Sequence, residues 1–462
     1  MISLPGIILI DDDIDQLNSI RESFTKIGLP CLPVQYINDY TNQSGIDHIC
    51  FDKVTPRIVI TDLNLVEAAN LSSKDLAGPI MNLLQKLNIA GPYILYFWSK
   101  NAGLVESVIK IIQERIENKK LLPISWGILD KTNLLGNPES LKIEIDKIIN
   151  DDSIFSSMFN WENRINNAAQ ETINSLYEMT RPNDSIEGGE YAPSHVALLQ
   201  DVLTIIANET LGPKNALSFP SEAVDQGLLP VLNDRLQNID RGSHNWKKSL
   251  PNIGEKVTID ESMKAKLNSF YHIEKIEKDY PKNHRGVFIP LSSEYISDDA
   301  NLKKICSKLG VASIDEILYS EFIDETKIQK ENLMDNLKEI SLGFVELSAE
   351  CDHAQKKTKL HRYLVAALIP EKLIGHCTFG KKNTKHEGIY RVPSFYLENE
   401  RYILKLSFKY QIGTKDKFII NSQEFNHKWF GNPLFRLRDQ ILSDITFKCS
   451  QYISRPGIVS FY

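Results

Sequence analysis

The sequence predicts an α/β protein whose N-terminal third forms a parallel five-stranded sheet with helices on both faces. Strand-like and helix-like segments alternate through residues 1–150, an order typical of a doubly wound sheet. The strand-like segments are continuous apolar runs, which is typical of strands buried on both faces. We expect three regions: this sheet domain over 1–150, a helical connector over 151–250, and an α+β C-terminal domain over 251–462.

The strands of residues 1–150 are short runs rich in β-branched or aromatic residues, and each stops at a polar residue. Four runs are clear: Ile7–Ile10, Arg57–Thr61, Tyr93–Trp98 and Ser125–Leu129. A fifth strand is expected near Cys31–Ile37, where the pattern is weaker. Between the strands, apolar residues recur at helical spacing in four segments: Gln16–Ile27, Gly78–Leu87, Leu104–Ile116 and Leu141–Ile149.

Residues 151–462 have a different pattern. Helical periodicity covers Asn160–Thr180 and Pro193–Thr210, and Gly/Pro/Asn-rich breaks separate the two. Beyond residue 251 the chain mixes a helix expected over Leu434–Ile453 with several strand-like runs. These runs are Gly286–Leu291, Gly343–Ser348, Leu364–Ile369 and Tyr402–Phe408.

Composition excludes several classes of protein. The 462 residues are 42% hydrophobic, so wholesale disorder is excluded. The net charge of −7 argues against a chain that coats nucleic acid. The six cysteines include no CxxC pair, which is typical of reduced thiols. No signal peptide or apolar run long enough to span a bilayer is present. We therefore expect a soluble cytoplasmic protein that does not bind membranes.

Polar side chains follow four of the predicted strands, at the edge where a doubly wound sheet binds its ligands. Asp11 and Asp12 follow the first strand, Asp62 the second clear one, Ser99 the third and Lys131 the fourth. Three carboxylates around one space repel each other and call for a hard divalent cation, for which Mg²⁺ is the best candidate. A carboxylate beside Mg²⁺ can attack phosphorus, a lysine can neutralise a phosphoryl oxygen, and a hydroxyl can bond another.

These segments resemble the receiver domain of two-component response regulators, a flavodoxin-like fold. The resemblance covers residues 5–150 and rests on four motifs: IILIDDDID at 7–15, VITDLNL at 59–65, YFWSKN at 96–101 and ILDKTN at 128–133. It implies that Asp62 is the phosphoacceptor, Ser99 the switch hydroxyl and Lys131 the lysine that contacts the phosphoryl group. It also implies a set of Mg²⁺ ligands: Asp11, Asp12, Asp62 and the backbone carbonyl of Asn64.

The segment departs from the family pattern in several places. Thr132 stands where the family has a proline that forms a cis peptide, and the stretch after Asp62 is longer and lacks the usual proline. Trp126 is the residue nearest to the family's switch aromatic. These departures imply intact chemistry with a changed conformational output. The alternative is a flavodoxin-like fold whose acids are simply solvated strand ends, but five matching positions in the right order favour the receiver.

The C-terminal region contains a local cluster, Val345 to His353, in which a strand-like run ends in Ser-x-x-Cys-Asp-His. Cys351 and His353 could act as nucleophile and base, since alternate positions of a strand share a face. With His376 and Cys377 they could instead form a zinc site, although the spacing is poor. The reading we favour is a structural strand end with a buried cysteine.

Residues 401–462 hold ten Lys and Arg against four Asp and Glu, with interleaved aromatic residues. This composition admits a nucleic-acid face or a dock for an acidic partner. We favour a solvated helix face, with Arg436, Arg438 and Lys448 outside and Leu437, Ile441 and Ile445 inside. No helix-turn-helix is evident after residue 150, which argues against a DNA-binding regulator.

Two C-terminal stretches, VELSAECDHAQKK and FRLRDQILSDITFKCSQYISRPG, resemble defence-associated bacterial proteins that carry N-terminal receivers. This group includes the receiver component of Detocs anti-phage systems, and it implies a phosphate sink. We therefore expect a signalling protein that accepts a phosphoryl group from a histidine-kinase-like sensor and acts with an effector protein of the same pathway. An oligomeric state is compatible with this expectation. The alternative is a receiver-regulated enzyme with its site at Cys351 and His353, but 151–462 show no P-loop, HExxH or nucleophile elbow.

Overall fold

The structure is a computed structural model that describes residues 6–37, 56–66, 71–89, 91–100, 102–134, 136–150, 154–182, 188–238, 243–323, 338–376, 388–415 and 429–454. The chain divides into two compact units. The first unit comprises Met1–Arg181 and Leu229–Glu255, and the second comprises Pro182–Leu228 and Lys256–Tyr462. Each unit is described by itself.

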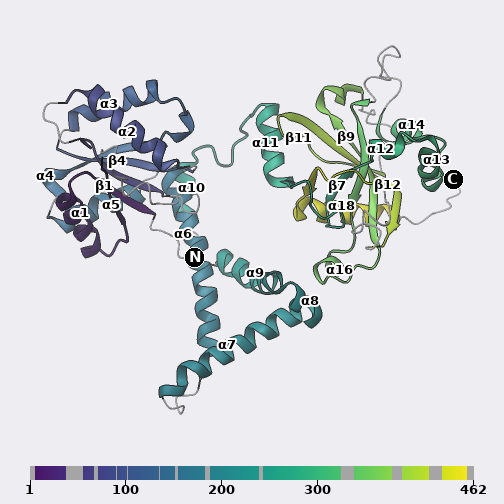
Figure 1. The fold of residues 1–462 in the computed structure, drawn as a ribbon, viewed down its shortest axis with the longest axis horizontal. Coiled ribbons are helices and arrows are strands. Elements are labelled where there is room, and N and C mark those ends of the chain that lie inside the picture. The colour runs from purple at the N-terminus through teal and green to yellow at the C-terminus, as the bar shows by residue number, and fades with distance from the viewer. Residues whose placement is uncertain are drawn as a thin grey trace. The chain divides into compact units, whose positions relative to one another are not determined.

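The first unit contains a five-stranded sheet in which every pair of neighbouring strands is parallel (Figure 1). The strand order β2-β1-β3-β4-β5 is that of a flavodoxin-like fold. This arrangement confirms the predicted fold class, and it includes the weakly indicated strand. The strands are β1 (Ile7–Asp11), β2 (Leu32–Gln35), β3 (Ile58–Asp62), β4 (Ile94–Ser99) and β5 (Ser125–Asp130).

Helices cover both faces of this sheet because its strands are apolar on both sides. On one face, side chains of α2 and α3 pack with Ile8, Val59 and Leu95. On the other face, side chains of α1 and α5 pack with Leu9, Ile60 and other residues of the same strands. The helices of this layer are α1 (Ile14–Lys26), α2 (Ser73–Leu87), α3 (Ala102–Arg115), the short α4 (Lys131–Leu134) and α5 (Pro138–Asn150).

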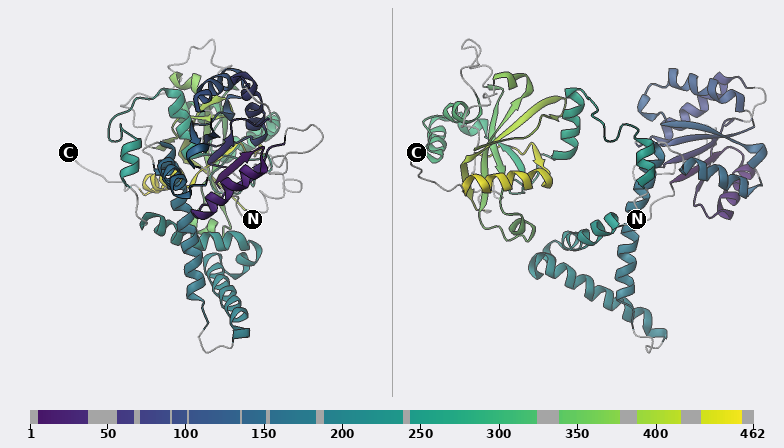
Figure 2. Two further views of the ribbon diagram at one scale, coloured as in Figure 1. Left: turned by 90° about the vertical axis from the view of Figure 1, so that its left-hand side faces the viewer. Right: turned by 180° about the vertical axis from the view of Figure 1, so that it is seen from behind.

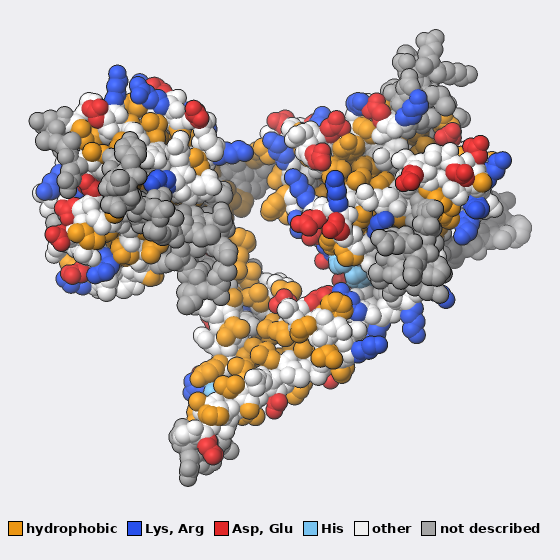
Figure 3. Space-filling view, viewed as in Figure 1, with side chains coloured by type: hydrophobic (Ala, Val, Ile, Leu, Met, Phe, Trp, Pro, Cys, Tyr) orange, Lys and Arg blue, Asp and Glu red, His pale blue; other side chains and the backbone are white. Residues whose placement is uncertain are grey.

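Residues 154–249 are mostly helical in the parts that the structure describes, as the periodicity predicted. The first unit holds α6 (Ile154–Met179) and α10 (Ser243–Ser249), and the second holds α7 (Gly188–Leu211) and α8 (Pro213–Ser218). The division between the units falls inside α9 (Pro220–Asn238). Hydrophobic side chains gather over α7 in the space-filling view (Figure 3). The exposed hydrophobic residues of this helix include Val196 and Ile205.

The second unit is built around an antiparallel sheet, so the C-terminal region is α+β as predicted (Figures 1 and 2). Its strands follow the order β10-β12-β9-β8-β7-β13-β6, and β11 pairs with β12. The two longest strands, β9 and β12, lie next to each other in this order. The bounds are β6 (Ile273–Lys275), β7 (Val287–Pro290), β8 (Ser341–Glu346), β9 (His361–Pro370), β10 (Ile389–Arg391), β11 (Phe395–Leu397), β12 (Glu400–Thr414) and β13 (Phe435–Leu437).

Each face of this second sheet has its own apolar core. On one face, side chains of α13 (Asp299–Leu309), α14 (Ile314–Ile317) and the π-helix η4 (Leu318–Phe322) pack on the strands. On the other face, α18 (Asp439–Ile453) supplies Ile441, Leu442 and Ile445. The remaining short elements are α11 (Glu261–His272), α12 (Ser293–Ile296), α16 (Glu350–Ala354) and η7 (Glu371–His376).

The helix predicted over Leu434–Ile453 was too long at its N-terminal end. Phe435 and Leu437 instead belong to β13, whose residues pair with β6 and β7. Arg438 is the N-cap residue, and the helix begins at Asp439. The prediction was wrong because the buried residues Leu437, Ile441 and Ile445 follow one another at helical spacing although a strand supplies the first of them.

Candidate metal centre

The polar residues predicted to meet at one edge of the sheet do lie at the carboxyl ends of neighbouring strands. Asp11 ends β1, Asp62 ends β3 and Ser99 ends β4, while Lys131 follows directly on β5. Asp62 lies opposite Trp98 on β4, and Ser99 lies opposite Asp130 on β5. Because all these strands run parallel, their carboxyl ends share one edge.

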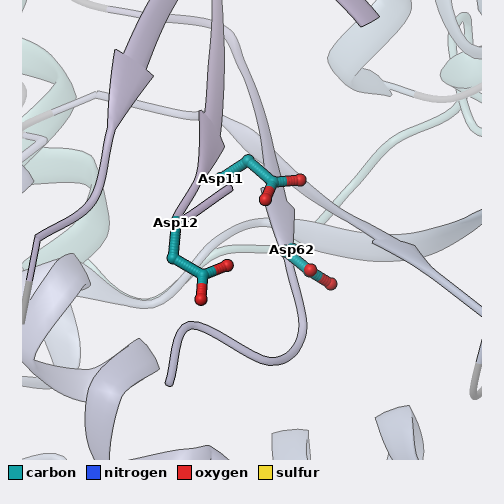
Figure 4. Close-up of side chains that lie close together, drawn as sticks. All are labelled: Asp11, Asp12 and Asp62. Atoms are coloured by element: carbon teal, nitrogen blue, oxygen red, sulfur yellow. The ribbon is translucent and has the colours of Figure 1, made fainter. Parts of the chain in front are cut away.

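Three carboxylates converge at this edge (Figure 4). Asp11, Asp12 and Asp62 each offer an oxygen, and these oxygens lie within 4.8 Å of one another. The side chain of Asp11 is buried, while Asp12 and Asp62 are half-buried. We call this set the acidic triad. Three carboxylate oxygens around one point fit a hard divalent cation such as Mg²⁺, which binds through oxygen and keeps part of its water shell.

The electrostatics of the acidic triad favour a cation. Burial raises the pKa of Asp11 to about 6, and the neighbouring charge of Asp62 adds to this effect while Lys131 opposes it. Burial also raises the pKa of Asp12. The raised pKa values mean that it is costly to keep three negative charges together in a partly desolvated space. A divalent cation would remove that cost.

Lys131 provides the one positive side chain that the structure shows in contact with the triad. Its Nζ lies 2.7 Å from Asp62 Oδ2 and 3.2 Å from Asp11 Oδ2. The side chain is buried, with a relative exposure of 5%. The strand β5 passes directly into α4 at Lys131, so the ammonium is positioned by the rigid sheet rather than by a flexible loop.

Thr132 has a physical role at the position where the resemblance leads us to expect proline. The backbone N–H of Thr132 donates to Asp130 Oδ1 at 2.8 Å, and the Asn133 side chain donates to Asp130 Oδ2 at the same distance. Proline has no N–H and could not make the first bond. No cis peptide occurs at any bond that the structure describes. Asp130 therefore fixes the start of α4 directly behind Lys131.

The two remaining predicted residues also lie at this edge. Ser99 is buried at the end of β4, next to the register partner of Asp62. The backbone N–H of Asn64 donates to Asp62 Oδ1 at 3.4 Å, and Asn64 Oδ1 accepts from the Val66 backbone N–H at 3.3 Å. These two contacts fold the chain after β3 back toward the triad.

Gln16 belongs to the same site, and the sequence reasoning missed it. Its Oε1 accepts a hydrogen bond from Lys131 Nζ at 2.9 Å, and its Nε2 donates to Asp13 Oδ2 at 2.7 Å. Asp13 is the N-cap of α1 and accepts from the backbone N–H of Asp15 and of Gln16. The sequence carried a signal for this, because Asp-x-x-Gln resembles a capping box.

The C-terminal cluster is arranged differently from the prediction. The strand β8 ends at Glu346, and residues 350–354 form the helix α16, so Cys351 and His353 do not occupy alternate positions of a strand. His353 Nε2 accepts the backbone N–H of Arg285 at 3.0 Å, and this bond occupies the lone pair that a general base would use. The side chains of Cys351 and His376, and the whole of Cys377, lie outside the described residues.

A buried polar group near this helix joins β8 to β9. The ring nitrogen Nδ1 of His361 lies 2.9 Å from Glu346 Oε1, and the Ser348 hydroxyl donates to the same oxygen. The Ser348 backbone N–H donates to Glu346 Oε2 at 3.1 Å. The imidazoles of His284 and His353 meet edge to face, with ring centroids 4.9 Å apart. These contacts account for Glu346, Ser348 and His353 of the cluster as internal structure.

The basic C-terminal segment presents few aromatic faces. Phe408, Trp429, Phe430 and Phe435 are buried in the two cores, so they are unavailable for stacking on bases. Arg436 lies on β13 rather than on a helix, and it pairs with Glu274 and Asp439. Phe418 lies outside the described residues.

Comparisons of the chain with protein-family models, with curated proteins and with solved structures found no match. In the part of the chain that the structure describes, no helix has the length and apolar character needed to cross a bilayer. Functional inference for this protein therefore depends on the geometry of the acidic triad and its surroundings.

Proposed function

We propose that this protein is a signalling protein of the receiver type that accepts a phosphoryl group on Asp62 in a Mg²⁺-dependent reaction. The observation that carries the proposal is the position of Lys131 Nζ, 2.7 Å from Asp62 Oδ2, beside a triad whose oxygens lie within 4.8 Å of one another. A structural ion pair would need one carboxylate beside the lysine. Three carboxylates with one ammonium leave a place for a divalent cation.

The residues present divide the chemistry between them. Asp11, Asp12, Asp62 and the backbone carbonyl of Asn64 would hold Mg²⁺, which supplies charge neutralisation for the phosphoryl oxygens when it is bound. An Oδ of Asp62 forms the new bond to phosphorus, and the bond between phosphorus and the donor breaks. Lys131 neutralises one phosphoryl oxygen. From the end of β4, Ser99 provides the hydroxyl for another.

The donor that the receiver resemblance implies is a phosphohistidine on a sensor protein. In that transfer the phosphorus–nitrogen bond of the donor breaks, the imidazole recovers a proton, and the acyl phosphate forms on Asp62. The resemblance of the C-terminal region supports a narrower role as a phosphate sink in an anti-phage pathway that contains a separate effector. A sink needs a competent acidic triad and no enzyme site in the second unit.

The test is the intact mass of the protein after incubation with acetyl phosphate and Mg²⁺. We expect one phosphoryl adduct on the wild type, and no adduct without Mg²⁺ or on Asp62→Asn. Asp146→Asn is a matched control, because Asp146 is an exposed carboxylate of α5 and does not lie at a strand end. An adduct that persists on Asp62→Asn, or no adduct on the wild type, would contradict the proposal.

A further inference from the structure

The ammonium group of Lys131 has three N–H bonds, and the structure supplies three acceptors for them. Two acceptors are carboxylates, Asp62 Oδ2 at 2.7 Å and Asp11 Oδ2 at 3.2 Å. The third is the neutral amide oxygen of Gln16 at 2.9 Å. Since Lys131 is buried, each of these bonds replaces water that the ammonium would otherwise contact.

The three acceptors differ in what happens to them during the proposed reaction. Asp11 would be a ligand of Mg²⁺, and an oxygen of Asp62 would become part of the acyl phosphate. Gln16 carries no charge and belongs to neither group. Its bond to Lys131 is therefore the one of the three that can persist through the metal-free, metal-bound and phosphorylated states.

Gln16 is itself held in place. Its Nε2 donates to Asp13 Oδ2 at 2.7 Å, and Asp13 caps the N-terminus of α1. The neighbouring charges fix which way the amide points, because a flipped amide would put its NH₂ group against the ammonium and its oxygen against the carboxylate. A continuous chain of hydrogen bonds thus runs from the cap of α1 through Gln16 to Lys131.

We propose that Gln16 is a positioning residue for phosphorylation, which holds the Lys131 ammonium beside Asp62 while the acidic triad exchanges lysine for metal. This inference rests on the proposed function. Without the Gln16 oxygen, the ammonium would satisfy its third N–H on the carboxylates and would compete with Mg²⁺ for Asp11. Loss of one hydrogen bond to a charged group corresponds to roughly a tenfold slower transfer.

The experiment compares Gln16→Met with the wild type and with Gln35→Met. Methionine keeps the length and helix propensity of glutamine but has no amide. Gln35 is the matched control, because its Nε2 donates to the Asp12 backbone carbonyl at 3.1 Å without contacting Lys131. Two quantities are measured: the rate of adduct formation from acetyl phosphate at a fixed Mg²⁺ concentration below saturation, and the hydrogen-exchange rate of the Lys131 ammonium by ¹⁵N NMR, assigned with Lys131→Met.

We expect Gln16→Met to form the adduct about tenfold more slowly and to expose the Lys131 ammonium to faster exchange, with Gln35→Met unchanged in both. A residue that merely caps α1 would lower the melting temperature without moving the ammonium exchange. An adduct rate equal to that of the wild type would overturn the role of Gln16 and leave the proposed function standing. Absence of an adduct on the wild type would overturn both.

Discussion

Arg57 donates two hydrogen bonds to the carboxylate of Glu162, from Nε to Oε2 at 2.7 Å and from Nη2 to Oε1 at 3.0 Å. Arg57 precedes β3 at the edge of the sheet opposite the acidic triad, and Glu162 lies on α6. The Arg57 Nη1 also donates to the Pro92 carbonyl at 3.2 Å. The first long helix after the sheet domain is therefore attached to the sheet by a planar fork that lysine cannot reproduce.

Replacement of Arg57 by lysine should lower the stability of the first unit by about 1 kcal/mol, because it removes a bidentate pair that is only partly exposed. The measurement is chemical denaturation monitored by circular dichroism. Glu144→Gln is the matched control, since the Lys147–Glu144 pair is exposed and lies within one helix. We expect no measurable change for that control. Equal losses in both variants would show that the fork adds nothing.

Substitutions in the acidic triad should separate metal binding from phosphorylation. Asp12→Asn should weaken Mg²⁺ binding, because it removes a charged oxygen ligand. Lys131→Met should bind Mg²⁺ more tightly than the wild type, because no ammonium then competes for Asp11 and Asp62. The same variant should form the adduct more slowly, because no ammonium then neutralises the phosphoryl oxygen. The Mg²⁺ affinity can be read from the rise in melting temperature with added Mg²⁺. Weaker Mg²⁺ binding by Lys131→Met would contradict this account.

The two units should respond to acid in opposite directions when metal is removed by a chelator. The folded pKa of Asp11 is raised to about 6, so the folded unit binds a proton more readily than the unfolded chain between about pH 4 and 6. Its stability therefore falls as pH rises through that window. Burial, with His353 adding to it, lowers the pKa of His284 to about 4. The unfolded chain then binds the proton more readily, so stability rises with pH up to about 6.5.

Two variants test the opposite pH dependences of stability expected for the two units. Relative to the wild type, Asp11→Asn should gain more stability at pH 7 than at pH 4.5, with a difference of about 2 kcal/mol. His284→Gln should show the reverse, with its relative gain at pH 4.5. The measurement is the thermal unfolding of the wild type and both variants at pH 4.5 and pH 7 in the presence of a chelator. The same sign for both variants would rule out the opposing titrations.

A glycine of β5 should be needed for packing rather than for backbone freedom. A Cβ at Gly127 would lie 2.4 Å from Cε1 of the Tyr96 ring on the neighbouring strand. We therefore expect Gly127→Ala to cost about 1–3 kcal/mol in the free energy of unfolding. Gly78→Ala is the control, because Gly78 lies within α2 with open space at its Cβ and should gain about 1 kcal/mol. Adding Tyr96→Leu to Gly127→Ala should recover part of the loss.

One sequence pattern, an apolar run that ends at a polar residue, predicted both the strands and the site residues at their ends. A strand buried on both faces must be apolar, so its first polar residue marks the carboxyl edge. Asp11, Asp62 and Ser99 each end their strand as expected. Gln16 was missed because its role depends on the position of Lys131, 115 residues away, and local spacing carries no information on that distance.

The errors in the second unit have a related cause. Cys351 and His353 are two residues apart and follow a strand, so the sequence alone does not show that the chain forms the helix α16 there. The role of His353 depends on Arg285, which lies two residues before β7 and 68 residues before His353. Contacts between distant segments decide whether a histidine serves as a base or as a hydrogen-bond acceptor for the backbone.

If Asp62 is phosphorylated as proposed, the sharing of one lysine between Asp11 and Asp62 would make metal and phosphoryl occupancy interdependent. Whatever draws Asp11 away from the ammonium leaves Lys131 free to serve the oxygens on Asp62, and whatever engages Lys131 on Asp62 leaves Asp11 open to a cation. Linkage requires the two effects to be equal in free energy. The phosphorylated protein should therefore hold Mg²⁺ more firmly than the unmodified one by the same factor as Mg²⁺ favours the phosphorylated form, so the cellular magnesium concentration would help to set the equilibrium between the two forms.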